Sequence, residues 1–205
     1  MMDHSLSIPS LAQRITEADR VLVGIDGAGA TGKSTLAALL AEQIPDAHVV
    51  HVDDFYLPTV RHGELEGAVG ALFDLPRLRT EVLQPAREGR AIQYRRYDWP
   101  TDALAELIEI PAGAPVIVEG VYCLDDVMRD AYSCSIWCHA PYELRLSRGL
   151  DRDGEDAREQ WVEVWMPLEE QYAQLQHPDD NADLVLDSAH GLSGTVFTVV
   201  ADRRD

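Results

Sequence analysis

Residues 27–34, which read Gly-Ala-Gly-Ala-Thr-Gly-Lys-Ser, constrain the fold of this chain more than any other feature. They fit the pattern G-x-x-x-x-G-K-[ST], follow the apolar run at residues 21–25, and precede Leu36 and Leu40 at helical spacing. Glycines permit the torsions that turn successive N–H groups inward, and a helix N-terminus adds partial positive charge. The segment therefore predicts a phosphate-binding loop, or P-loop, between a buried strand and a helix.

The residues of this P-loop have separate expected roles. Lys33 is expected to reach the β- and γ-phosphates of ATP as a catalytic cation, and the Ser34 hydroxyl to ligate Mg²⁺. ATP and Mg²⁺ are therefore the predicted cofactors. The residues expected to contact the nucleotide are Gly27, Ala28, Gly29, Ala30, Thr31, Gly32, Lys33, Ser34 and Thr35.

The charge of the chain limits its partners. Its 205 residues carry a formal net charge of −19, from 36 acidic and 17 basic side chains. Such a balance argues against duplex nucleic acid, which needs a basic face to bind. Residues 1–9 lack the pattern of a secretory signal, and no apolar run approaches the ~20 residues of a membrane helix. We expect a cytoplasmic protein without nucleic-acid or membrane partners, and homo-oligomers stay open.

Three cysteines, Cys123, Cys134 and Cys138, occur in the chain. Together with His139, the last two have a spacing that invites a metal site, but they lie in an apolar run without a second pair of ligands. We interpret them as buried thiols of a strand. Their odd number, without a disulfide framework, suits a reducing compartment.

Apolar runs alternate with helical spacing along the chain. Helices are expected at residues 11–18 and 75–88, a flexible loop at 57–72, and a hairpin at 91–99 and 104–110. Buried strands are expected at residues 21–25, 47–52, 116–120, 134–138, 184–186 and 195–200. This alternation predicts one α/β domain over residues 1–205, with the P-loop nucleoside triphosphate hydrolase fold and a three-layer, doubly wound, mainly parallel sheet.

Two further segments are expected to serve the domain. Residues 145–158 are densely charged and contain glycines, which predicts an exposed, mobile segment. Residues around 57–110 are expected to form an insertion on the substrate side. The C-terminal helix is expected to bury an apolar stripe and to be bent or interrupted at Pro167. The stripe consists of Trp161, Val164, Leu168, Tyr172 and Leu175.

Two acids follow buried strands of the predicted sheet. Asp53 follows the strand at residues 47–52, and Glu119 ends the strand at 116–120. Ligands bind at the carboxyl edge of an open α/β sheet, beside the P-loop. Asp53 is therefore expected to accept the proton of an attacking hydroxyl and to contact Mg²⁺, and Glu119 to hold Mg²⁺. Asp54, on the other face, is interpreted as a cap or turn residue.

The P-loop by itself leaves the reaction open. No N-K-x-D motif follows a late strand, which argues against a GTPase, and the chain is small for an ATPase motor. Transfer of a phosphoryl group to a small acceptor remains. A switch protein that binds ATP without a dedicated acceptor is the alternative, although such a switch has no need of a base at Asp53.

These motifs, taken in order along the chain, resemble the uridine kinase family, part of the wider group with phosphoribulokinase and pantothenate kinase. The resemblance extends over residues 21–187, nearly the whole chain. It rests on residues 27–34, Asp53-x-Phe55-Tyr56, Phe73-Asp74-x-Pro76, Tyr97-Asp98-Trp99, Glu119-Gly120 and Arg148-x-x-x-Arg152-Asp153.

The resemblance implies ATP-dependent phosphorylation of the 5′-hydroxyl of a nucleoside, with uridine or cytidine first. Asp53 would be the general base and Tyr56 a wall of the nucleoside pocket. Asp74 would hold the ribose hydroxyls, and Tyr97 and Trp99 would frame the base. A mobile lid around residues 145–160 would carry Arg148, Arg152 and Arg158, with Arg152 catalytic.

The sequence departs from the family pattern at two positions. Asp102 stands where the family has a histidine in its base pocket, and Arg148-Gly149 stands where the family has paired arginines. The first departure leaves another alcohol, such as a nicotinamide riboside- or pantothenate-like acceptor, as an alternative. The second leaves the lid with one cation fewer.

Overall fold

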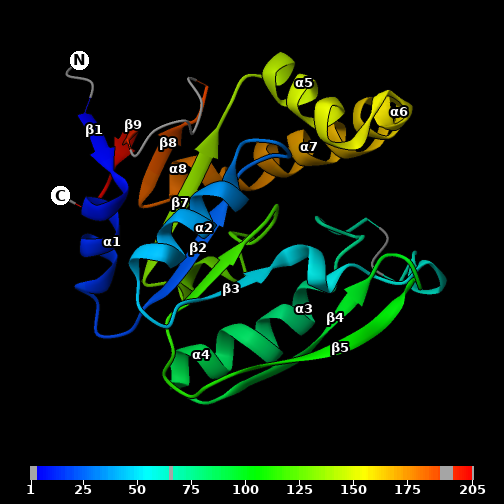
Figure 1. Ribbon diagram of the computed structural model, residues 1–205. Coiled ribbons are helices and arrows are strands. Elements are labelled where there is room, and N and C mark those ends of the chain that lie inside the picture. The colour runs from blue at the N-terminus through cyan, green and yellow to red at the C-terminus, as the bar shows by residue number, and fades with distance from the viewer. Residues whose placement is uncertain (1–3, 65–66, 190–195, 205) are drawn as a thin grey trace.

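The computed structural model describes residues 4–64, 67–189 and 196–204 (Figure 1). Its main sheet has seven strands in the order β1-β9-β8-β7-β2-β6-β3. The strands β8, β7, β2, β6 and β3 run parallel, whereas β9 is antiparallel to both β8 and β1. The strands span His4–Ser7 (β1), Leu22–Asp26 (β2), His48–His51 (β3), Val116–Glu119 (β6), Cys134–His139 (β7), Leu184–Asp187 (β8) and Val196–Asp202 (β9).

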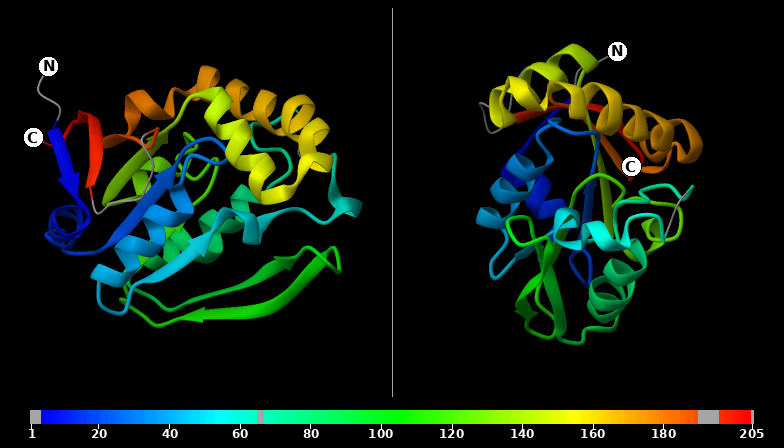
Figure 2. Two further views of the ribbon diagram at one scale, coloured as in Figure 1. Left: turned by 45° about the horizontal axis from the view of Figure 1, so that its top comes forward. Right: turned by 90° about the vertical axis from the view of Figure 1, so that its right-hand side faces the viewer.

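Helices cover both faces of this sheet (Figure 2). Helices α1 (Ile8–Thr16) and α2 (Lys33–Gln43) pack on one face, where Ile15 and Leu36 join a core with Ile25 of β2. On the other face Leu78 and Tyr172, from two separate helices, join a second core with strands β2, β3 and β6. The predicted three-layer, mainly parallel α/β fold is therefore confirmed.

The central strands are buried for their whole length. Every residue of β2 and β6 is buried, the pattern of a parallel strand that is covered on both faces. Cys123, Cys134 and Cys138 are buried free thiols, so the apolar interpretation of the two β7 cysteines holds.

The insertion between β3 and β6 contains a helix and a hairpin. The helix runs without interruption through α3 (Leu75–Leu78), a π-helical turn (Arg79–Leu83) and α4 (Gln84–Glu88). It ends at Gly89, whose φ of 69° is the left-handed conformation that glycine adopts most readily. Strands β4 (Ile92–Asp98) and β5 (Ala103–Ile110) pair antiparallel in a separate sheet beside this helix, as the sequence predicts.

The charged segment at residues 145–158 is exposed from residue 151 onward, apart from the half-buried Ala157, but its start is not the exposed segment that the sequence predicts. Residues Tyr142–Asp153 form helix α5, and Arg145, Gly149 and Leu150 are buried in it. The Arg145 side chain is 7% exposed and pairs with Glu169 at 3.0 Å. The local charge density was misleading because this arginine is neutralised by a carboxylate distant in the sequence.

The C-terminal helix buries a different face from the one predicted. It is continuous through α6 (Arg158–Gln160), a π-helical turn (Trp161–Trp165) and α7 (Met166–Gln176). Leu168 and Leu175 are 39% and 62% exposed. A π turn holds more residues than an α turn, so the buried face passes from Trp161 to Met166 and then follows α-helical spacing. The buried positions are Trp161, Met166, Glu169 and Tyr172.

Both ends of the described chain lie at one edge of the sheet. Strand β9 occurs where residues 195–200 were expected to form a strand, although Thr195 lies outside the described residues. Strand β1 was not predicted, because its four residues carry no alternation long enough to recognise. Short helices complete the chain: 3₁₀ turns at Val52–Phe55, Thr59–Arg61, Arg129–Ala131 and Glu155–Ala157, and α8 at Pro178–Asn181. Among the described residues, no helix is long and apolar enough to span a membrane.

Candidate active site

A pocket of about 630 Å³ opens beside the P-loop, at the carboxyl ends of β3 and β6. The P-loop, the turn after β3, the hairpin tip, helices α5 and α7, and the π-helical turn Trp161–Trp165 all contribute to its walls. The predicted site residues that line it are Gly29, Ala30, Gly32, Lys33, Ser34, Thr35, Asp53, Tyr56, Trp99, Glu119, Arg148 and Arg152. Gly27, Ala28, Thr31, Asp74, Tyr97 and Arg158 do not line it.

The P-loop joins β2 to α2 through two glycines with positive φ. Gly27 has a φ of 144°, and a Cβ there would lie 2.3 Å from the carbonyl oxygen of Cys138. Gly32 has a φ of 89° at the N-cap of α2. The Lys33 ammonium donates to the Ala28 carbonyl at 3.0 Å, so the loop itself holds this cation at the pocket. The torsions and the lysine fit a phosphate cradle.

Asp53 lies on the 3₁₀ turn Val52–Phe55 and not on the strand, which ends at His51. Its carboxylate is accessible from the pocket but surrounded by protein. That partial burial, together with the negative charge of Glu119, raises the pKa of Asp53 above its ordinary value, although Lys33 and Arg152 oppose the shift. A carboxylate with a raised pKa is a stronger base than an ordinary one.

Glu119, at the end of β6, lines the same pocket as Asp53 and is 5% exposed. Burial alone would raise its pKa, but hydrogen bonding to His51 and the positive charges of Lys33 and His51 bring the pKa below the ordinary value. The two atoms that form this hydrogen bond, His51 Nδ1 and Glu119 Oε1, are 2.5 Å apart. Glu119 is thus held ionised, which suits a ligand of a hard cation.

Aromatic side chains form the wall opposite the P-loop. Tyr56 contacts Phe73, Tyr97 and Trp99, with ring centroids 5.2, 5.4 and 4.6 Å away. Trp99 is 55% exposed at the tip of the β4–β5 hairpin. Tyr97 is buried behind these rings, so it supports the wall without facing the pocket.

Asp102, which replaces the family histidine, is occupied by local contacts. Its carboxylate accepts the Thr59 N–H at 2.9 Å and the Tyr97 hydroxyl at 2.8 Å. It therefore ties the hairpin tip to the loop after the Asp53 turn. Its φ is 50°, a left-handed conformation that aspartate tolerates better than most residues.

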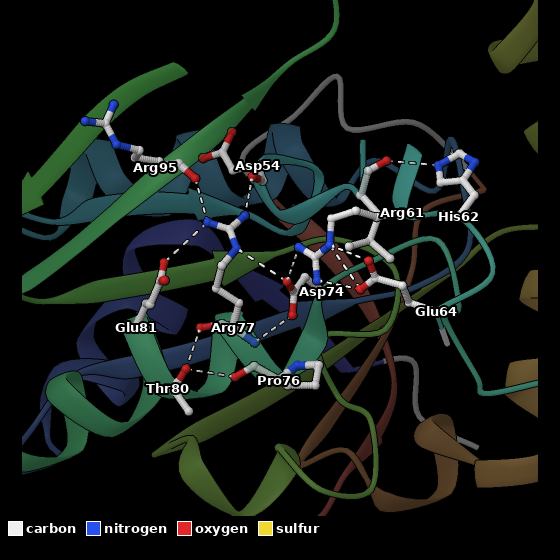
Figure 3. Close-up of polar contacts among 11 residues, drawn as sticks. Asp54, Arg61, His62, Glu64, Asp74, Pro76, Arg77, Thr80, Glu81 and Arg95 are labelled. Atoms are coloured by element: carbon white, nitrogen blue, oxygen red, sulfur yellow. Dashed lines mark hydrogen bonds and ion pairs between the residues drawn. The ribbon is translucent and has the colours of Figure 1, made fainter. Parts of the chain in front are cut away.

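Asp74 is likewise engaged away from the pocket (Figure 3). It is the N-cap of α3 and accepts the Arg77 N–H at 3.1 Å. Its other oxygen accepts from the Arg61 guanidinium at 3.2 Å. The structure does not bring this carboxylate to a position where it would face a ligand in the pocket.

Of the three lid arginines, two reach the pocket. Arg148 donates to the Ser188 carbonyl at 2.9 Å, and Arg152 pairs with Asp153 at 2.7 Å. The Arg152 guanidinium also lies 5.7 Å from the ring centroid of Trp161. Arg158 is half-exposed and pairs with Glu155 outside the pocket.

Two buried acids at the P-loop were not predicted. Asp26 accepts the N–H groups of Gly27 and Leu124, at 2.6 and 2.8 Å, and the hydroxyl of Tyr172 at 2.8 Å. Burial raises its pKa to about 6 against these hydrogen bonds. The sequence does contain a signal for Asp26, because this acid directly follows the apolar run at residues 21–25.

Glu169 is the second unpredicted acid. One oxygen accepts the Gly29 N–H at 2.9 Å, and the other accepts from Arg145 of α5 at 3.0 Å. It therefore links the P-loop to two helices. No local sequence pattern distinguishes Glu169, since it lies among other acids on a polar helix.

The fold and the site define a P-loop nucleotide-binding protein. Comparison with curated proteins narrows this class. The uridine kinases of Escherichia fergusonii and of Escherichia coli strain K12 are each 32% identical to the chain over 145 residues, which are 65% of this chain and 68% of each relative. The chain therefore belongs to the uridine kinase family of P-loop kinases.

Solved structures agree with this fold. A protein from Bacillus stearothermophilus described as a possible uridine kinase superposes with a TM-score of 0.66 at 21% identity, over 87% of this chain and 96% of that one. A candidate fructose transport system kinase from Silicibacter sp. TM1040 superposes with a TM-score of 0.63 at 24% identity, over 86% and 95%. No family model matches the chain.

Proposed function

We propose that this kinase transfers the γ-phosphoryl group of ATP to a hydroxyl of a small metabolite, with the 5′-hydroxyl of uridine or cytidine as the first candidates. The observation that carries the proposal is one pocket that joins the Asp53 carboxylate, the P-loop and an aromatic wall. The relatives named uridine kinase support the same acceptor class. The lining suits a flat, hydroxylated molecule, because rings at Tyr56 and Trp99 provide stacking faces.

In the proposed reaction, Asp53 accepts the proton of the acceptor hydroxyl as its oxygen attacks the γ-phosphorus. A bond forms between these two atoms, and the bond from the γ-phosphorus to the bridging oxygen of ADP breaks. Lys33 exchanges its Ala28 carbonyl for the phosphate oxygens and so neutralises their charge. ADP and the phosphorylated acceptor then leave.

Mg²⁺ fits the donor set of this pocket. Ser34, Asp53 and Glu119 would hold it, since hydroxyl and carboxylate oxygens are its preferred ligands and the pKa of Glu119 is lowered. When bound, the ion would offset the negative charge of the phosphates.

The lid is proposed to be the segment around residues 145–160. Arg148 and Arg152 lie on its pocket side and would contact the transferring phosphates, with the fork of each guanidinium matching phosphate oxygens. Closure would exclude water from the reaction. We infer a single catalytic domain over residues 1–205, with the segment around 57–110 as the acceptor side, and a cytoplasmic location that suits its free thiols.

Asp102 keeps a second acceptor class open. Its carboxylate already holds Thr59 and Tyr97, so it has little capacity to read the edge of a pyrimidine. This occupancy favours acceptors recognised by shape and stacking, including a nicotinamide riboside- or pantothenate-like alcohol. A regulatory protein that binds ATP without an acceptor is the remaining alternative.

The decisive experiment measures ADP release with ATP·Mg²⁺ against a panel of nucleosides, sugars and vitamin-linked alcohols. Asp53→Ala should lower acceptor-dependent turnover by about 10²-fold or more while ATP affinity changes little. Asp151→Asn, an exposed carboxylate on α5, is the matched control. ATP binding without turnover on any acceptor would support the regulatory alternative, and unchanged activity in Lys33→Ala would refute the P-loop assignment.

A further inference from the structure

Arg77 connects three segments of the insertion through a single guanidinium (Figure 3). It lies on α3, and its side chain is only 12% exposed. Burying so much of an arginine is costly unless its donors are used. Nη1 and Nη2 donate hydrogen bonds, whereas Nε has no hydrogen-bond partner and lies 3.8 Å from a carboxylate oxygen of Asp74. Its contacts therefore indicate what the residue is for.

One set of contacts holds the turn that carries Asp53. Arg77 Nη2 donates to the carbonyl oxygen of Asp54 at 3.2 Å. The guanidinium carbon also lies 4.4 Å from the ring centroid of Phe55, a cation–π contact. Asp54 and Phe55 are the two residues that directly follow Asp53, so both contacts fix the backbone beside the proposed base.

The other set of contacts anchors Arg77 to the acceptor side of the pocket. Its Nη1 donates to the Arg95 carbonyl of β4 at 2.7 Å and to Glu81 at 3.3 Å. Strand β4 also reaches the turn directly, since the Tyr94 hydroxyl donates to the Asp54 carboxylate at 2.8 Å. The turn is therefore held between α3 and the hairpin.

Such a support matters because a 3₁₀ turn of four residues has poor hydrogen-bond geometry of its own. Burial and nearby charges change the pKa of Asp53 but do not orient its carboxylate. Within the described chain, no side chain donates a hydrogen bond to this carboxylate. The direction of this carboxylate depends on the backbone of the turn. A displacement of about 1 Å at a reacting group can cost about 10²-fold in rate.

We propose that Arg77 is a positioning residue for the phosphoryl-transfer reaction: it locks the Val52–Phe55 turn onto α3 and β4 and so aims the Asp53 carboxylate at the acceptor hydroxyl. The inference rests on the proposed role of Asp53 as the base. Arg77 lies outside the pocket lining and does not contact the reacting groups.

The first test needs no acceptor. Arg77→Met should speed amide hydrogen exchange at residues 52–57 by about tenfold or more, because the turn opens more often, while exchange at the P-loop stays as in the parent protein. Arg79→Met is the matched control, with the same loss of charge on an exposed position two residues further along the helix. Unchanged exchange at residues 52–57 would overturn the proposal.

The second test measures turnover with the best acceptor from the panel. Arg77→Met should lower kcat by about tenfold or more with little change in the KM for ATP. Arg77→Lys keeps the charge but cannot bridge the carbonyls of Asp54 and Arg95. Its kcat should lie between that of Arg77→Met and that of the parent protein. If Arg77→Met does not fold, the comparison of Arg77→Lys with the parent protein tests the proposal.

A double-mutant cycle separates positioning from a general loss of structure. If Arg77 acts through Asp53, adding Arg77→Met to Asp53→Ala should change the remaining turnover by less than about twofold. If the double variant instead loses turnover by the product of the two single-variant losses, the proposal is overturned. Full activity in Asp53→Ala would instead refute the base, and the hydrogen-exchange test would still decide the role of Arg77 in the turn.

Discussion

The indole of Trp161 occupies the space that a side chain at residue 149 would need. A Cβ at Gly149 would lie 2.6 Å from the Trp161 ring, and one at Gly29 would lie 2.8 Å from the same ring. Trp161 thus packs between the P-loop and helix α5, and its Nε1–H donates to Asp153 at 3.0 Å. Position 149, where the family pattern has its second arginine, therefore has no room for a side chain beside this ring.

Gly149→Ala should destabilise the protein by about 1–3 kcal/mol and lower turnover, because the new methyl group overpacks against Trp161. Chemical denaturation and steady-state kinetics would measure both effects. Ser147→Ala, an exposed position on the same helix, should leave both unchanged. A Gly149→Ala variant as stable and active as the parent would show that Trp161 is free to move.

The free energy of unfolding should decrease as the pH rises, because Asp26 loses its proton in the folded protein. Its folded pKa is about 6 against an ordinary value of 3.8, so the folded state holds the proton more tightly than the unfolded state. The free energy of unfolding therefore loses a contribution as the pH increases from about 4 through 6. Denaturation at several pH values would show the parent losing about 1–3 kcal/mol over this range relative to Asp26→Asn. A difference that stays constant with pH would contradict the assignment.

Glu169→Ala should destabilise the protein by about 3–5 kcal/mol, because it leaves the buried Arg145 guanidinium with only the half-exposed Glu170, 4.0 Å away. It also frees the Gly29 N–H, so we expect weaker ATP binding in a fluorescence titration. The exposed Glu163 supplies the control, as Glu163→Ala on the same helix should have neither effect. The proposed link would be wrong if Arg145→Met restored none of the lost stability.

Trp99→Ala should raise the KM for the acceptor by about tenfold, since stacking on one aromatic ring contributes about 1–3 kcal/mol. The KM for ATP should not change, because Trp99 lies on the hairpin tip and not at the P-loop. Steady-state kinetics with each substrate varied in turn would measure both constants. Leu107→Ala, on the exposed surface of β5, is the control, and an equal response in the two variants would exclude Trp99 from acceptor binding.

The elements that the sequence predicts well are those with a local signal. The P-loop follows from glycine torsions and a helix start, and the buried strands follow from unbroken apolar runs. Asp53 and Glu119 carry a local signal as well, an acid at the end of an apolar strand, and their roles stay predictions. Asp26 carries the same signal. The predicted exposure of Arg145 and the predicted stripe through Leu168 and Leu175 were wrong. Local charge density and an assumed α-helical period do not show which distant side chains bury a position.

The sequence by itself determined a phosphate loop at residues 27–34, the strands that carry it, and membership in a kinase family. Only the tertiary structure decided which side chains act on that loop and on the acids around it. Glu169 lies 140 residues from the Gly29 N–H that it accepts, and Trp161 meets Gly29 and Gly149 from another helix. The difference is physical: torsion preferences and apolar periodicity are properties of neighbouring residues, whereas the pairing of a buried charge depends on where distant segments meet.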